Sequence, residues 1–151
     1  MKFVPESEIE NVLSQLENKK YFNTISNTLI EEQPGIIGYI ESEGFDILTP
    51  EEKDLLWYCC LVIYSAAKNV AFDIPPITLK ELGEEEDLNY DIVGENMKFA
   101  EMADTFFTDF EQEDLLAFVE DTLIPDEDDF ITPVGRKVLF ISLKSIIDVL
   151  K

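Results

Sequence analysis

The chain has 151 residues, 46% of them hydrophobic and 11% aromatic, which is enough apolar material for one domain with a substantial core. This content argues against intrinsic disorder, although 33 acidic residues against 11 basic ones give a formal net charge of −22 at pH 7. A field of that sign repels nucleic acid and anionic membrane surfaces, and it attracts basic partners and divalent cations.

The hydrophobic spacing is helical from the start of the chain, and no segment of four or more residues alternates in the manner of a strand. Apolar residues three or four apart predict one helix after Pro5 and a second that ends at Gln33. The Pro34-Gly35 pair then opens a short third helix, which extends to Glu41 and is closed by Gly44.

The helix with the clearest start signals is predicted for residues 50–69. Thr49 stands at the N-cap, Pro50 at the first helical position, and Glu52 completes a capping box. Because the segment Leu55–Tyr64 is apolar on every side, this helix should be central, with the others packed around it.

The same apolar segment is the longest in the chain and contains both cysteines. Its ten residues are about half of the ~20 that a bilayer-spanning helix needs, so we expect no membrane span. The N-terminal residues lack the pattern of a signal peptide, which favours a cytoplasmic protein. Cys59 and Cys60 are adjacent and would point about 100° apart on a helix, so we expect two buried thiols without a disulfide.

The second half of the chain continues the helical pattern with many more acids. A short piece from Thr78 is expected to lead into a loop at Glu84–Asp87, followed by one helix over residues 88–106. Thr108 and Glu111 then match a capping box for the next helix.

The last helix is predicted to start at Thr132-Pro133, after an acidic loop at Asp126–Asp129. This start echoes Thr49-Pro50, but the two helices that follow differ in sequence, so the echo indicates shared capping chemistry rather than duplication. We therefore predict an all-α protein: a single compact domain over residues 1–151, with about six or seven helices around the apolar helix at residues 50–69.

Acidic residues are concentrated in one third of the chain. Residues 81–129 contain nineteen acids and one base, Lys98, whereas residues 130–151 have a net charge of +3. The last helix could form a docking strip for an acidic partner or for phosphate. We favour the interpretation that it packs against the acidic third and offsets part of its self-repulsion. The charged residues of this helix are Arg136, Lys137, Lys144, Asp148 and Lys151.

Histidine is absent from the chain, which excludes Ser-His-Asp and Cys-His nucleophilic systems and the Glu-x-x-His iron sites of helical bundles. No glycine-rich phosphate loop occurs, and the single arginine offers little bidentate recognition of anions. An EF-hand loop starting at Asp126 fails because Phe130, Ile131 and Lys137 occupy positions that need other residue types. We therefore predict no catalytic residue, no cofactor and no metal site.

One pattern of carboxylates nevertheless fits a known chemistry. Acids at i and i+3 share a helix face, and two such pairs on facing helices can hold Mg²⁺ through oxygen ligands. The pairs Glu81-x-x-Glu84 and Glu101-x-x-Asp104 resemble the metal-binding pattern of the all-α nucleoside triphosphate pyrophosphohydrolases, the MazG and dUTPase-like group. The resemblance covers these four residues and implies an Mg²⁺-dependent enzyme, which stays an alternative.

Two runs of four consecutive acids, the first acidic run (Glu84–Asp87) and the second acidic run (Asp126–Asp129), are the strongest local charges. We predict a non-enzymatic protein-protein interaction module, of adaptor, inhibitor or immunity type, that binds a basic protein and makes no direct contact with nucleic acid or a membrane. A protein that mimics DNA is a further alternative. The predicted partner-binding residues are Glu84, Glu85, Glu86, Asp126, Glu127, Asp128 and Asp129.

Overall fold

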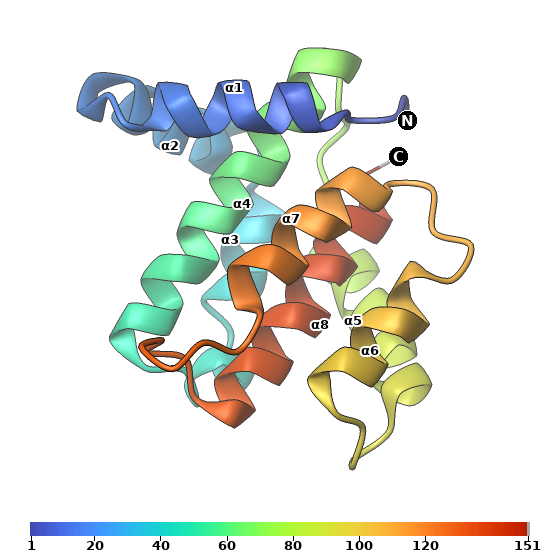
Figure 1. The fold of residues 1–151 in the computed structure, drawn as a ribbon. Coiled ribbons are helices and arrows are strands. Elements are labelled where there is room, and N and C mark those ends of the chain that lie inside the picture. Colours follow the sequence, from blue (N-terminus) through green and yellow to red (C-terminus); the bar gives the residue numbers. More distant parts are fainter. Residues whose placement is uncertain (151) are drawn as a thin grey trace.

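Eight α-helices and one short 3-10 helix make up the computed structural model, which describes residues 1–150 (Figure 1). No strand occurs in this part of the chain, so the predicted all-α fold is confirmed, and the expected six or seven helices come close to the observed number. The elements are α1 (Glu6–Leu16), α2 (Lys19–Glu32), α3 (Pro34–Ile40), η1 (Glu43–Phe45), α4 (Pro50–Ala71), α5 (Leu79–Val93), α6 (Phe99–Phe107), α7 (Glu113–Leu123) and α8 (Pro133–Val149).

None of the helices in residues 1–150 combines the length and the apolar character that crossing a membrane would require.

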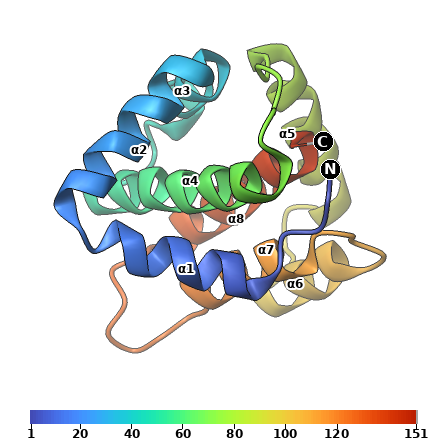
Figure 2. The same cartoon turned by 90° about the horizontal axis from the view of Figure 1, so that it is seen from above.

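Two helices, α4 and α8, share the centre of the molecule. Figure 2 shows them running side by side through its middle, with the remaining helices around them. Helix α4 is buried on all sides from Cys59 to Ala67, which confirms its predicted central position. Helix α8 is equally buried from Leu139 to Ile147, and it packs against α5 and α7 as well as α4.

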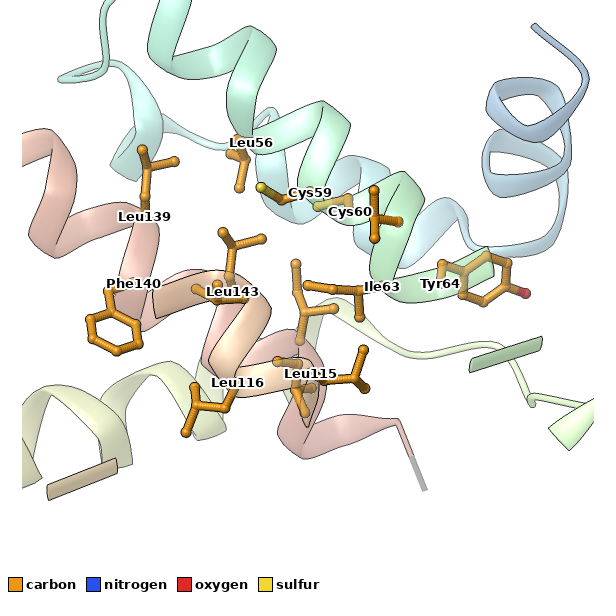
Figure 3. Close-up of a cluster of buried hydrophobic side chains, with 14 of the residues drawn as sticks. Leu56, Cys59, Cys60, Ile63, Tyr64, Leu115, Leu116, Leu139, Phe140 and Leu143 are labelled. Carbon is orange, nitrogen blue, oxygen red and sulfur yellow. The ribbon is translucent and has the colours of Figure 1, made fainter. Parts of the chain in front are cut away.

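The core between these helices is built mainly from aliphatic side chains, with aromatic residues such as Phe140 and with both cysteines. Cys59 and Cys60 lie within it as free thiols, as predicted, and burial raises the pKa of Cys59 to about 12, so this thiol stays protonated at neutral pH. Figure 3 shows side chains of α4 meeting those of α8 and α7: Leu56, Cys59, Cys60, Ile63, Leu139, Leu143, Leu115 and Leu116.

Helix α5 runs without a break through the first acidic run, which corrects the loop predicted at Glu84–Asp87. Thr78 caps its start, because the Thr78 hydroxyl accepts a hydrogen bond from Glu81 N at 3.1 Å. Gly94 ends the helix with a φ of 65°, a left-handed conformation that favours glycine. The single helix predicted over residues 88–106 is therefore two helices, α5 and α6.

The predicted capping box of Thr108 and Glu111 is wrong, because α7 begins at Glu113. Thr108 lies at the end of α6 instead, where its hydroxyl donates to the carbonyl oxygen of Asp104 at 3.0 Å. A threonine can hydrogen-bond backward onto the preceding turn as easily as forward onto the next, and the local pattern does not distinguish the two.

A buried carboxylate joins the starts of the two central helices. Glu52 Oε1 accepts the N–H of Thr49 at 2.8 Å, as the predicted capping box of α4 requires. The other oxygen, Oε2, accepts both the N–H and the hydroxyl of Thr132, each at 2.8 Å. Thr132 is the N-cap of α8, so one glutamate serves two N-caps, and the repeated Thr-Pro segments meet at this residue.

The third position of α8 is Gly135, where a capping box would normally carry its own glutamate or glutamine. A Cβ atom at Gly135 would lie 2.0 Å from Glu52 Oε2, so the glycine makes room for the carboxylate of α4. Burial raises the pKa of Glu52, but the hydrogen bonds from Thr49 and Thr132 outweigh burial, and its pKa lies below the ordinary value.

Candidate partner-binding groove

Helix α5 places the four acids of the first acidic run in different environments. Glu84 and Glu85 line a surface groove, whereas Glu86 is half-buried and accepts a hydrogen bond from the Tyr39 hydroxyl at 3.0 Å. Asp87 is exposed to solvent. Successive residues on a helix point about 100° apart, so four consecutive acids on α5 cannot act as one patch.

The groove that holds Glu84 and Glu85 lies between α5, the segment that precedes it, and the end of α8. Its volume is about 470 Å³, and we call it the α5 groove. It combines three carboxylates with an apolar lining, and no Lys or Arg is among the lining residues. These residues are Ile74, Pro75, Pro76, Ile77, Glu81, Glu84, Glu85, Leu88 and Val149.

A buried glutamine holds the wall of the α5 groove in place. Gln33 has no exposed surface; its Nε2 donates to the carbonyl oxygen of Pro75 at 3.1 Å, and its Oε1 accepts the N–H of Ile77 at 2.8 Å. Gly35 lets this segment approach α3, since a Cβ there would lie 1.9 Å from the Ile77 carbonyl oxygen. The extended segment is thereby held by two hydrogen bonds with Gln33 and by close packing against Gly35, and the groove is preformed.

The electrostatics of the α5 groove are one-sided. Lys80 Nζ lies 3.9 Å from Glu84 Oε1, but both side chains are largely exposed, so the pair contributes little. Burial raises the pKa of Glu86, the Tyr39 hydroxyl opposes this, and the charge of Asp87 adds to the increase. Because three carboxylates and no Lys or Arg line the groove, the field at its mouth is negative, and a cationic group would be attracted to it.

The second acidic run, Asp126–Asp129, has different surroundings. Asp126, Glu127 and Asp128 are exposed on the loop before α8. Asp129 is half-buried, pairs with the guanidinium of Arg136, and accepts the N–H groups of Asp126 and Ile131 at 2.9 and 3.2 Å. The Asp126 N–H and the Arg136 guanidinium hold the pKa of Asp129 below its ordinary value.

The two acidic runs lie near opposite ends of α8. Arg136 at its start binds Asp129, whereas Val149 at its end lines the α5 groove. Thirteen residues separate these positions, and at 1.5 Å per residue the distance along the helix is about 20 Å. Figure 1 shows the orange loop before α8 far from the red end of that helix. The predicted partner-binding residues therefore do not form one surface.

The structure does not bring together the four acids that resemble a pyrophosphohydrolase site. Glu81 and Glu84 line the α5 groove, whereas Asp104 lies close enough to Glu120 on α7 for its charge to raise the Glu120 pKa, after burial and Asp121. Among residues 1–150, no three His, Cys, Asp or Glu side chains converge as metal ligands. Asp104 therefore has a different neighbour from Glu81 and Glu84, and the sequence spacing alone did not make the four acids one cluster.

The basic residues of α8 bind partners within the protein, and α8 packs against α5 and α7 of the acidic third, as expected. Lys144 is buried; its Nζ lies 2.9 Å from Asp148 Oδ2 and 3.1 Å from Asn89 Oδ1. Lys137 Nζ donates to the carbonyl oxygen of Gly94 at 3.0 Å. Lys151 lies outside the described residues. In the part of the chain that the structure describes, Arg136, Lys137 and Lys144 are thus engaged within the fold.

Sequence reasoning missed the apolar half of the α5 groove. That half is formed by Pro75, Pro76 and the exposed Leu88, together with Ile74, Ile77 and Val149. The one signal available was the Pro75-Pro76 pair itself, because consecutive prolines favour an extended segment with a solvated backbone.

Comparison with protein-family models, with curated proteins and with solved structures found no match for this chain.

Proposed function

We propose that this protein is a non-enzymatic interaction module that binds a basic protein through the α5 groove. One observation carries the proposal: Glu81, Glu84 and Glu85 surround an apolar lining in a preformed groove of about 470 Å³. An isolated acidic surface would supply attraction only. Acids beside apolar side chains supply attraction together with area to bury, and protein interfaces combine both.

The shape of the α5 groove favours an extended ligand segment. One wall is the extended stretch Ile74–Ile77 and the other is the face of α5 that carries Glu81, Glu84 and Leu88. A segment in which Lys or Arg residues alternate with apolar residues would place cations at the carboxylates and apolar side chains against the prolines. Such a segment in a basic protein is the proposed ligand.

The experiment compares three versions of the full chain as baits for native protein mixtures at physiological salt. One is the wild type. The groove variant carries Glu81→Gln, Glu84→Gln and Glu85→Gln, and the loop variant carries Asp126→Asn, Glu127→Gln and Asp128→Asn. Each variant removes three exposed or half-exposed charges, so both have a formal net charge of −19 instead of −22. Matched charge separates a local site from long-range attraction.

We expect one basic protein that the wild type and the loop variant retain and the groove variant loses. Retention of the same proteins by all three baits, with elution together at modest salt, would reduce the binding to non-specific charge attraction and contradict the proposal. If duplex DNA displaced the captured protein and both variants lost it equally, the protein would be a DNA mimic and the groove would not be the site.

A further inference from the structure

A second groove lies between α1 and α7, with α4 as its floor. Its volume is about 480 Å³, and we call it the α1–α7 groove. It shares no residue with the α5 groove, and again no Lys or Arg is among the lining residues. The lining residues are Glu6, Ile9, Glu10, Leu13, Tyr58, Asp114, Ala117, Phe118, Asp121 and Thr122.

Acids and apolar side chains alternate around this groove because of helical spacing. On α1, Glu6 and Glu10 are four residues apart, and so are Ile9 and Leu13, which gives two adjacent rows on one face. On α7, Asp114 and Asp121 are seven residues apart, two turns of helix, with the apolar Ala117 and Phe118 between them.

Tyr58 of α4 is half-buried in the floor. Burial raises the pKa of its phenol, and the charges of Cys59 and Glu17 raise it further by smaller amounts. The result is an apolar channel with carboxylates contributed by both flanking helices.

Hydrogen bonds join α1 to α7 near the starts of both helices. The N–H of Glu6 donates to Asp114 Oδ2 at 2.9 Å, which ties the first residue of α1 to the first turn of α7. Gln112, just before α7, accepts the N–H of Val4 at 3.0 Å and donates to the carbonyl oxygen of Lys2 at 2.9 Å. The relative position of the two helices is thus fixed by three bonds across the sequence, and the channel is preformed.

We propose that the α1–α7 groove docks a basic amphipathic helix from a protein partner. A helix laid in such a channel would contact it through apolar residues at i, i+3, i+4 and i+7, with Lys or Arg beside them facing the four acids. Each groove helix has eleven residues, or about 16 Å, which matches a partner helix of about three turns.

The charge of the groove selects this occupant over the other candidates. A second copy of the chain would bring another net charge of −22 against four carboxylates, so self-association through this face is opposed. An anionic membrane surface is repelled for the same reason. A cationic helix satisfies both the apolar channel and the acids, and this inference stands independently of the α5 groove.

The test uses a designed 15-residue peptide as its probe. Its leucines lie at helical i, i+3, i+4 and i+7 positions with lysines beside them, and a control peptide has the same composition with the leucines scattered around the helix. Binding to the full chain is measured by fluorescence anisotropy at 0.15 M salt. Hydrogen exchange reports which helices become protected.

Three variants locate the binding. Ala117→Trp fills the channel without changing the charge, and Glu10→Gln with Asp121→Asn removes two of its acids. Asp126→Asn with Asp128→Asn removes the same charge from the loop that follows α7, outside the groove lining, as the matched control. Circular dichroism checks that each variant keeps its helix content.

We expect at least tenfold weaker binding of the amphipathic peptide to Ala117→Trp and about fivefold weaker binding to the Glu10/Asp121 variant. The loop control should change less than twofold, and α1 and α7 should gain protection when the peptide binds. Equal binding of the scattered peptide, or equal losses for the groove and loop double variants, would overturn the proposal by reducing it to charge attraction. If Ala117→Trp does not fold, the two matched double variants decide the outcome.

Discussion

The two acidic runs have the same length and charge, yet the fold treats them differently. On α5, the run Glu84–Asp87 is divided by helical geometry: two acids line a groove, one bonds to Tyr39 and one is solvated. In the loop before α8, the run Asp126–Asp129 stays together, but its last member is taken up by Arg136.

This difference teaches that a run of charge in the sequence does not define a binding surface. The α5 run gains significance from residues far away, because Gln33 holds the groove wall against which Glu84 and Glu85 lie. The loop run gains none, since Asp126, Glu127 and Asp128 are exposed and none of the four acids of this run lines the α5 groove or the α1–α7 groove. The neighbours of an acid therefore matter more than its local density.

The largest effect is expected at Glu52, the residue that caps α8 just after the loop run. Glu52→Ala removes the acceptor for the N–H groups of Thr49 and Thr132 and for the Thr132 hydroxyl, and buried donors without partners are costly. We expect a loss of about 2–4 kcal/mol in the free energy of unfolding, measured by urea denaturation. Glu51→Ala, at the exposed neighbouring position, is the control and should cost well under half of that.

The contribution of Glu52 to stability should also depend on pH, because only the ionised carboxylate accepts these hydrogen bonds fully. Its pKa is lowered in the folded state, so its contribution to stability is present above the ordinary glutamate pKa of about 4.3 and is lost as the pH falls through the folded-state value. Glu52→Gln should therefore approach the wild type in stability as the solution is acidified. A stability difference that stayed constant from pH 7 to below pH 4 would contradict this.

The next effect concerns the space beside that carboxylate. Gly135→Ala would place a Cβ atom 2.0 Å from Glu52 Oε2, so the start of α8 or the carboxylate has to move. Overpacking of this kind costs about 1–3 kcal/mol, and thermal unfolding should show a lower Tm. Gly38→Ala in α3 is the matched control, because a Cβ there meets nothing within 4 Å and alanine favours a helix. A Tm for Gly135→Ala equal to or above that of the wild type would contradict the shared cap.

A smaller effect is expected at the hydrogen bond between Tyr39 and Glu86, the half-buried acid of the first run. Tyr39→Phe deletes the hydroxyl that donates to Glu86 Oε1, which leaves burial and Asp87 to raise the pKa of Glu86 further. An NMR titration of the Glu86 carboxyl carbon should show this increase, together with a stability loss of about 1 kcal/mol. Tyr90→Phe serves as control. An unchanged Glu86 titration in Tyr39→Phe would show that the hydrogen bond does not affect the pKa of Glu86.

Local signals were enough to predict the helix starts at Thr49-Pro50 and Thr132-Pro133, because a capping residue followed by proline acts within one turn. They did not predict that Glu52 caps both helices, since 80 residues separate Glu52 from Thr132. The same limit applies to the α5 groove, whose wall depends on Gln33 through contacts across more than 40 residues. Contacts of that range follow from packing, not from periodicity.

The break between α5 and α6 could in principle have been predicted from the sequence. Gly94 is a helix-ending residue, but the apolar spacing across it continues by a step of seven from Ile92 to Phe99, which hid the interruption. Gly83 shows the opposite case, because α5 continues through it and through the acids that follow. Glycine weakens a helix without necessarily ending it, so tertiary contacts decided both positions.

The most direct test of the central claim is a set of binding isotherms for the basic protein captured by the wild type. They are measured by calorimetry at 0.15 M salt with the wild type, the groove variant and the loop variant. The two variants have the same formal net charge of −19. Three rim charges are worth about 0.2–1 kcal/mol each, so we expect the groove variant to bind about tenfold more weakly and the loop variant to stay within about twofold of the wild type. Equal weakening in both variants would contradict the claim that position, and not charge alone, makes the α5 groove a binding site.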